Sequence, residues 1–217
     1  MKSKIRCDEL PFPSWGGKRE GAGRKRKSAE SVPHARRPLL SRHHPVHVTW
    51  KLRRGLPRLR NRRTYAVLLA ALRGGMERAV FRLNHYVVMS NHLHLIVEAE
   101  DRRSLSRGLH ALAIRLARAL NRLWLRRGRV FLERFHEHVL RTPTEVRRAL
   151  VYVLDNARKH GAWLSGGGPD PFSSACDAVR EGTASQAGSG DGQPFLPLPQ
   201  TWLLRLGWLR GRAGRHG

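Results

Sequence analysis

The sequence contains few cysteines and few acidic residues, and it has no long apolar run. Its two cysteines, Cys7 and Cys176, lie too far apart to suggest a disulfide framework, which favours a reducing compartment. No apolar segment approaches the ~20 residues of a membrane-spanning helix. These absences predict a cytoplasmic protein with no membrane partner.

The shortage of acidic residues leaves a large positive charge. There are 16 Asp and Glu against 42 Lys and Arg, for a formal net charge of +26. A codon bias that favours Arg would raise the number of cations, but it would not explain why acids are so few. Such a balance does not determine a fold, but it predicts a polyanionic partner such as nucleic acid.

Composition divides the chain into three parts. Residues 1–45 hold 12 Lys or Arg against 4 Asp or Glu and contain few apolar side chains that a core could bury. This composition predicts a flexible basic arm. Residues 161–217 hold 12 of the 21 glycines. We therefore expect 162–217 to be a Gly/Pro-rich linker, closed by a short apolar segment that docks on the core. Residues 46–161 remain as the main domain.

Hydrophobic periodicity within the main domain predicts alternating strands and helices. The tight Ser90-Asn91 connection favours a hairpin, and leucines recur every three or four residues after position 104. The expected strands are 47–52, 84–89, 92–99 and 130–140, and the expected helices are 63–82, 102–127 and 142–160. The order β-α-β-β-α-β-α predicts an α+β fold, a ferredoxin-like split βαβ sheet with one further helix.

Two histidines stand one residue apart in the third expected strand, in the stretch HLHLIVEA (92–99). Side chains alternate along a strand, so His92 and His94 share one face while Leu93 and Leu95 share the other. The pair is either packed and hydrogen-bonded within an ordinary sheet, or it offers two nitrogens to one metal ion, which then needs a third ligand from elsewhere.

The last expected helix carries Tyr152 and Asn156, four residues apart and therefore on one helical face. A tyrosine hydroxyl can act as a nucleophile, and an amide oxygen is an acceptable ligand for Mg²⁺ or Mn²⁺. Taken alone, Tyr152 fits equally well as a core aromatic whose hydroxyl lies at the edge.

The combination of HLHLIV (92–97) with YVLDN (152–156) and the basic stretch up to Gly161 resembles the HUH single-tyrosine transposases. It is most similar to their REP-associated branch, in which the tyrosine stands in the pattern YIxxNPV(K/R)xG. The similarity spans about 46–161. The chain departs from the pattern at Ala157 and Ser90, where the branch often has Pro, and neither change removes a reactive group.

This resemblance implies that His92, His94 and Asn156 hold Mg²⁺ or Mn²⁺ and that Tyr152 is the nucleophile. The implied activity is nicking and rejoining of single-stranded DNA, with hairpin or palindromic repeats, through a 5′-phosphotyrosine. The implied enzyme is a transposase acting as a monomer or homodimer. A protein of the same fold that binds DNA or RNA without cleaving it remains the alternative.

Basic residues in three places are candidates for contacts with nucleic acid: Lys18, Arg19, Arg24, Lys25, Arg26, Lys27, Arg126, Arg127, Arg129, Arg158 and Lys159. We expect the second HxH pair, His136 and His138, to lie on the sheet surface or contact DNA. We expect His43, His44 and His47 to be solvated or to face DNA, and Trp124 and Trp163 to pack in the core. A nucleotide hydrolase of the histidine-triad type would need a third alternating histidine, but position 96 is Ile.

Overall fold

The computed structural model describes residues 39–75, 77–78, 80–132, 134–159, 169–176 and 196–211, with side chains left out for 77, 78 and 155–159. The basic arm up to residue 38, Trp163 and the expected helix stop at Gly161 lie outside the described residues.

A five-stranded antiparallel sheet with the strand order β2-β3-β4-β1-β5 forms the centre of the fold. The elements in chain order are β1 (Val46–Lys51), α1 (Arg62–Arg73), β2 (Glu77–Arg78), β3 (Phe81–Val88), β4 (His92–Ala99), α2 (Arg102–Leu123), β5 (His136–Val139), α3 (Pro143–Lys159), α5 (Trp202–Arg205) and the 3₁₀ turn η1 (Gly207–Arg210).

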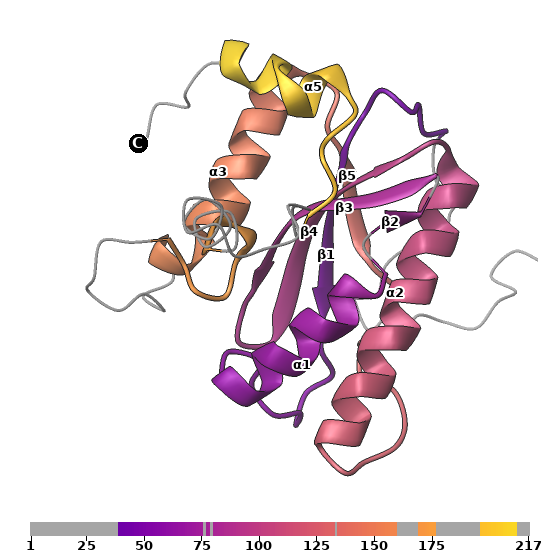
Figure 1. The fold of residues 1–217 in the computed structure, drawn as a ribbon, viewed down its shortest axis with the longest axis vertical. Helices are drawn as coiled ribbons and strands as arrows, with labels where there is room; N and C mark the ends of the chain where they lie inside the picture. The colour runs from indigo at the N-terminus through magenta and orange to yellow at the C-terminus, as the bar shows by residue number, and fades with distance from the viewer. Residues whose placement is uncertain are drawn as a thin grey trace, which may run out of the picture. The chain divides into compact units, whose positions relative to one another are not determined.

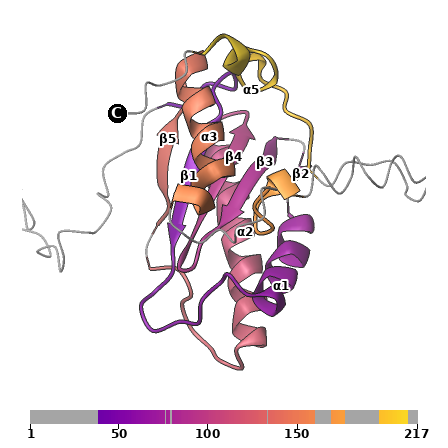
Figure 2. The ribbon, with the colours of Figure 1, turned by 90° about the vertical axis from the view of Figure 1, so that its left-hand side faces the viewer.

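Both long crossovers skip a strand. Helix α1 carries the chain from β1 past β4 to β3, and α2 carries it from β4 past β1 to β5. This is the ferredoxin-like split βαβ arrangement, so the predicted fold class is confirmed. Helices α2 and α3 lie on opposite sides of the sheet (Figure 1), and α3 lies over the strands when the molecule is turned (Figure 2).

Strand β4 is buried on both faces. Its odd-numbered side chains, Leu93, Leu95 and Val97, are fully buried in the core beneath α1 and α2. Ile96 points the other way and joins a separate apolar cluster beneath α3. His92 and His94 share the face of Ile96, because side chains alternate along a strand.

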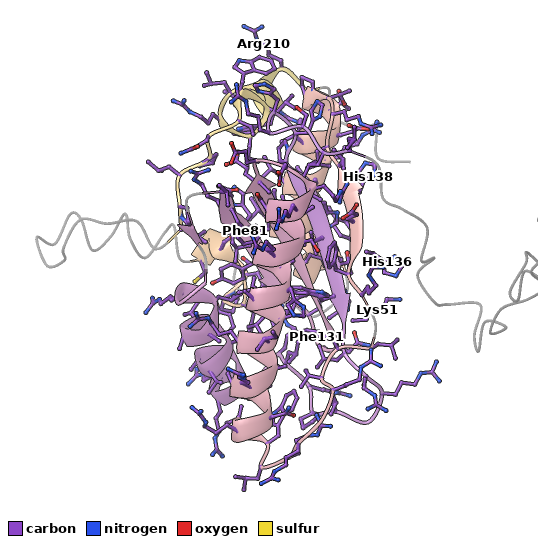
Figure 3. All side chains as sticks on the ribbon, turned by 90° about the vertical axis from the view of Figure 1, so that its right-hand side faces the viewer. Lys51, Phe81, Phe131, His136, His138 and Arg210 are labelled. Atoms are coloured by element: carbon purple, nitrogen blue, oxygen red, sulfur yellow. The ribbon has the colours of Figure 1, made fainter. Side chains whose placement is uncertain are left out.

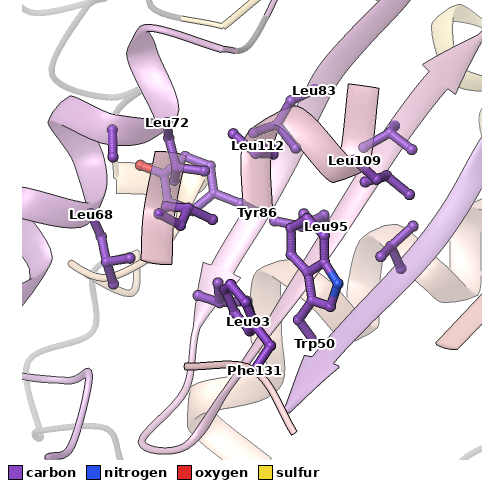
Figure 4. Packing of buried hydrophobic residues seen from close by; sticks show 14 of the residues in the cluster. Trp50, Leu68, Leu72, Leu83, Tyr86, Leu93, Leu95, Leu109, Leu112 and Phe131 are labelled. Atoms are coloured by element: carbon purple, nitrogen blue, oxygen red, sulfur yellow. The ribbon is translucent and has the colours of Figure 1, made fainter. Parts of the chain in front are cut away.

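The core beneath α1 and α2 is built from the predicted leucine stripe. Leu105, Leu109, Leu112, Leu116 and Leu120 are buried, and they pack toward Tyr86, Leu83 and Leu95 of the sheet (Figure 4). The partly buried Trp124 packs against the same core, as expected.

The second apolar cluster holds α3 on the opposite face. Val146, Leu150 and Val153 of α3 pack with Val87 and Ile96 of the sheet. Leu203 and Leu204 of α5 complete the cluster, so the apolar segment near the end of the chain does dock on the core.

The stretch 169–176 also packs against the sheet. Arg60 binds Asp170 with two hydrogen bonds of 2.9 Å, and both side chains are almost fully buried. The backbone of Phe172 accepts from Val88 N at the end of β3. This contact covers part of the open edge of the sheet, where unpaired backbone groups would otherwise face solvent.

Several predicted boundaries were wrong, and the short strand β2 was not predicted. The strand expected at 84–89 begins at Phe81. Helix 63–82 ends at Arg73, because Gly74 caps it and the chain then enters β2 and β3. Helix 102–127 ends at Leu123, before the left-handed residues Leu125 and Gly128. The strand expected at 130–140 is reduced to β5, with an isolated bridge between Leu52 and Phe131 preceding it.

None of the helices in the described part of the chain has both the length and the apolar character needed to cross a membrane.

The close approach of α2 to β3 depends on Gly108. A Cβ added there would meet ring atoms of Phe81 at less than 3.0 Å, whereas one added at Gly74 meets only the flexible end of Arg115. Overpacking costs about 1–3 kcal/mol, more than the gain of up to about 1 kcal/mol from replacing a helical glycine. We expect Gly108→Ala to lower the free energy of unfolding and Gly74→Ala to leave it nearly unchanged in urea denaturation. Equal stability of the two variants would contradict this packing.

Candidate active site

The two histidines of β4 form the centre of the candidate site. His94 is 4% exposed, while His92 is half-buried at the start of the strand. Their ring centroids lie 4.7 Å apart and the rings are nearly perpendicular. His92 Nδ1 lies 2.8 Å from Asn91 Oδ1, which orients the ring from the hairpin turn.

Strand β1 supplies two further polar groups that the sequence did not single out for the site. Thr49 Oγ1 lies 3.0 Å and His47 Nε2 3.2 Å from His94 Nδ1. Thr49 is the direct partner of His94 across the two strands. The expectation that His47 is solvated was therefore wrong, because the side chain is half-buried between the strand and α3. A contact of His47 with DNA stays a prediction. The only signal in the sequence was the polar alternation at positions 47, 49 and 51.

The environment of His47 favours its neutral form. The pKa of His47 is lowered to about 4, mainly by burial and to a smaller extent by the nearby His138. An imidazole that stays neutral offers one N–H and one lone pair, so it can either donate to His94 or accept from it.

Helix α3 brings Tyr152 to the same place. The Tyr152 ring meets the His94 ring edge-on with centroids 5.0 Å apart, and it lies 5.7 Å from the His47 ring. The helix begins with a reciprocal cap, in which Glu145 Oε2 accepts from Thr142 N and Thr142 Oγ1 accepts from Glu145 N. The predicted helix start at Thr142-Pro143 is thus explained by capping and by a proline in the first turn.

Asn156 lies in α3 one turn after Tyr152, and its side chain is outside the described part. Helical spacing puts it on the face of Tyr152. Its part in the site remains a prediction. The same holds for Arg158 and Lys159 in the last turn of α3.

The other two tyrosines of the chain lie on the far side of the sheet. Tyr65 and Tyr86 are 8% and 0% exposed in the core beneath α1 and α2. Their hydroxyl groups lie 3.0 Å apart and bond to each other. Of the three tyrosines in the sequence, Tyr152 is therefore the one whose ring packs against His94 and His47.

The second HxH pair lies on the same sheet face but is exposed. The register sets His138 opposite His47 and His136 opposite Thr49. The two side chains lie along β5 near Lys51 (Figure 3). His138 Nε2 is 3.9 Å from Glu145 Oε1, a loose contact between side chains that are 65% and 35% exposed. The pair therefore occupies the sheet surface, as expected.

The donor set fits a divalent cation in part. The contacts at the Nδ1 atoms of His92 and His94 leave Nε2 as the nitrogen of each ring that would bind a metal, and ligating histidines are commonly held in this way. Within the described residues, no cluster of three or more His, Cys, Asp or Glu side chains could hold a metal ion. Asn156, the third ligand that the resemblance implies, stays a prediction, because its side chain lies outside the described part.

The predicted basic contacts fall into two groups. Lys18, Arg19 and the cluster 24–27 lie outside the described residues. After α2, Arg126 donates to Asn121 Oδ1 at 2.9 Å and approaches the carbonyl of Arg129, while Arg129 donates to the carbonyl of Leu132. Arg127 is exposed and makes no hydrogen bond within the described part of the chain.

Comparison with known proteins agrees with the fold. No protein-family model matches the sequence, and no curated protein matches it. Among solved structures, the chain is similar to a REP-associated tyrosine transposase bound to a REP hairpin, with 22% identity and a TM-score of 0.53. The match covers 75% of this chain and 94% of that chain. At this identity the likeness shows a shared fold.

The contrast between Arg126 and Arg127 gives a direct test of the turn after α2. Arg126→Ala removes hydrogen bonds that close the turn and should cost about 1 kcal/mol, while Arg127→Ala should change stability by less than about 0.5 kcal/mol. Thermal unfolding of both variants measures the difference. If Arg127→Ala proved the more destabilising, the assignment of these two side chains would be wrong.

Proposed function

We propose that this protein is a transposase-like enzyme that nicks and rejoins single-stranded DNA through a covalent 5′-phosphotyrosine. The observation that carries the proposal is the position of Tyr152: of three tyrosines, it alone packs against His94 of the histidine pair. Support also comes from the net charge of +26 and from a fold shared with a tyrosine transposase that was solved with a DNA hairpin.

The reaction is a transesterification at phosphorus. The Tyr152 oxygen attacks the scissile phosphate and loses its proton, the bond to the 3′ oxygen breaks, and that oxygen takes up a proton to become a free 3′-OH. The number of phosphoester bonds is unchanged, so the same steps in reverse rejoin a strand. A phenol with a pKa near 10 is mostly protonated at neutral pH, so its proton must pass to a water or a nearby base.

His92 and His94 would hold a divalent cation, Mg²⁺ or Mn²⁺, together with Asn156. When bound there, such a cation polarises the scissile phosphate and stabilises charge on the leaving 3′ oxygen. Imidazole is a softer ligand than carboxylate, so we expect Mn²⁺ to support the reaction at least as well as Mg²⁺. The sheet face between β5 and α3 would receive the splayed single strand.

The substrate class follows from the same reasoning. Tyr152 must reach a phosphate that lies against the sheet. A single strand can place its backbone there more easily than a duplex can, so we expect the substrate to be single-stranded at the cleaved position. We propose a hairpin or palindromic repeat with single-stranded flanks, bound by a monomer or homodimer.

Substitution of Tyr152 by Phe tests the nucleophile. The change removes one oxygen and keeps the ring, so DNA binding should remain within about twofold and the fold should be kept. Wild type, incubated with Mn²⁺ and hairpin oligonucleotides built from repeats beside its coding region, should form an adduct stable in denaturing gels. The adduct should carry a label placed 3′ to the nick, and Tyr152→Phe should form none.

Tyr86→Phe is the matched control for this experiment. It also removes one hydroxyl, but from the buried pair with Tyr65 on the far side of the sheet, so adduct formation should persist. An adduct with Tyr152→Phe would assign the nucleophile elsewhere. Tight DNA binding by wild type with no adduct on any flank would favour a DNA-binding protein that has lost cleavage.

The metal requirement is tested with His94→Ala and with chelator. Both should abolish adduct formation, while His136→Ala, which removes an exposed histidine from the same sheet face, should keep it. Binding of Mn²⁺ measured by electron paramagnetic resonance should be lost in His94→Ala and kept in His136→Ala. Undiminished cleavage in excess EDTA would refute the metal assignment.

A further inference from the structure

The contacts of His94 point to a role for a residue on the neighbouring strand. His94 is almost fully buried, and its Nδ1 lies within hydrogen-bonding distance of two groups from β1, His47 Nε2 and Thr49 Oγ1. The His47 and His94 rings are tilted by 33° with centroids 5.2 Å apart. Two side chains of one strand thus converge on one nitrogen.

That nitrogen decides whether His94 can bind a cation. A neutral imidazole carries one hydrogen, and the nitrogen without it holds the lone pair. His94 can offer Nε2 to a metal only when Nδ1 carries the hydrogen. Because Nδ1 is buried, this hydrogen needs an acceptor inside the protein.

Of these two atoms from β1, His47 Nε2 is the stronger acceptor. An imidazole lone pair is more basic than a threonine hydroxyl oxygen, and it lies in the plane of a ring that packing holds in place. The His47 ring packs against both His94 and Tyr152, with centroids 5.2 and 5.7 Å away. The hydroxyl of Thr49, in contrast, rotates and can donate or accept.

We infer that His47 is a positioning residue for the cation site, because its Nε2 accepts the hydrogen of His94 Nδ1 and so keeps His94 Nε2 as the metal-binding nitrogen. The inference rests on the proposed function only for the cation at His92 and His94. The ligand at this site is that divalent cation, and His47 acts through His94 and is not itself a metal ligand.

Three variants separate this role from packing. His47→Phe keeps an aromatic ring packed against His94 and Tyr152 but removes the acceptor. His47→Gln restores an acceptor at a similar reach from the backbone on a non-aromatic side chain. Thr49→Val removes the second group from the same nitrogen while keeping a β-branched side chain in the strand.

Two measurements without DNA read out the role. Losing a partner that orients a ligating histidine costs 10–100-fold in metal affinity in comparable sites. We expect His47→Phe to weaken Mn²⁺ binding by about 10–100-fold, His47→Gln to recover most of that loss, and Thr49→Val to have a smaller effect. Nitrogen-15 NMR of the metal-free protein should show His94 hydrogenated at Nδ1 in wild type and shifted toward the other tautomer in His47→Phe.

Unchanged Mn²⁺ affinity and an unchanged His94 tautomer in His47→Phe would overturn the inference, as would a wild type that binds no Mn²⁺. These outcomes differ from failure of the proposed function. If His47→Phe weakens Mn²⁺ binding and shifts the tautomer but wild type never forms a DNA adduct, the role of His47 stands and the strand-transfer activity falls.

Discussion

Burial of β4 on both faces is the constraint on which the rest of the structure depends. Its odd-numbered residues fill the core beneath α1 and α2, so its even-numbered residues must emerge beneath α3. A slip of one residue would bury the histidines in the leucine core and move Leu93 and Leu95 to the face beneath α3, at a cost of several kcal/mol. The position of the histidine pair is therefore enforced by hydrophobic packing rather than by any interaction between the histidines themselves.

Because the ferredoxin-like unit covers one face with α1 and α2, the other face is left for chemistry. Helix α3 reaches that face through a capped first turn, and it is held there by Val87 and Ile96 beneath it and by Leu203 and Leu204 from near the end of the chain. This packing sets Tyr152 against His94. A segment near the end of the chain thus helps to fix the candidate nucleophile.

Local patterns predicted much of this arrangement. The bounds of β4, the hairpin at Ser90-Asn91 and the start of α3 follow from alternation, turn chemistry and capping, all of which act within a few residues. The end of α1 was missed because Gly74 caps the helix, whereas the apolar pattern continues beyond it. The contact of His47 with His94 could not be read from either strand alone, because the pairing register of β1 and β4 arises only when both pack on the same core.

Mapping the covalent adduct tests the central claim, that the face beneath α3 is the active site. Wild type would be allowed to react with labelled hairpin DNA, digested with nuclease and trypsin, and analysed by tandem mass spectrometry. The nucleotide phosphate should be found on the peptide 149–158, at Tyr152. A phosphate on any other residue, or on a peptide containing Tyr65 or Tyr86, would contradict this assignment.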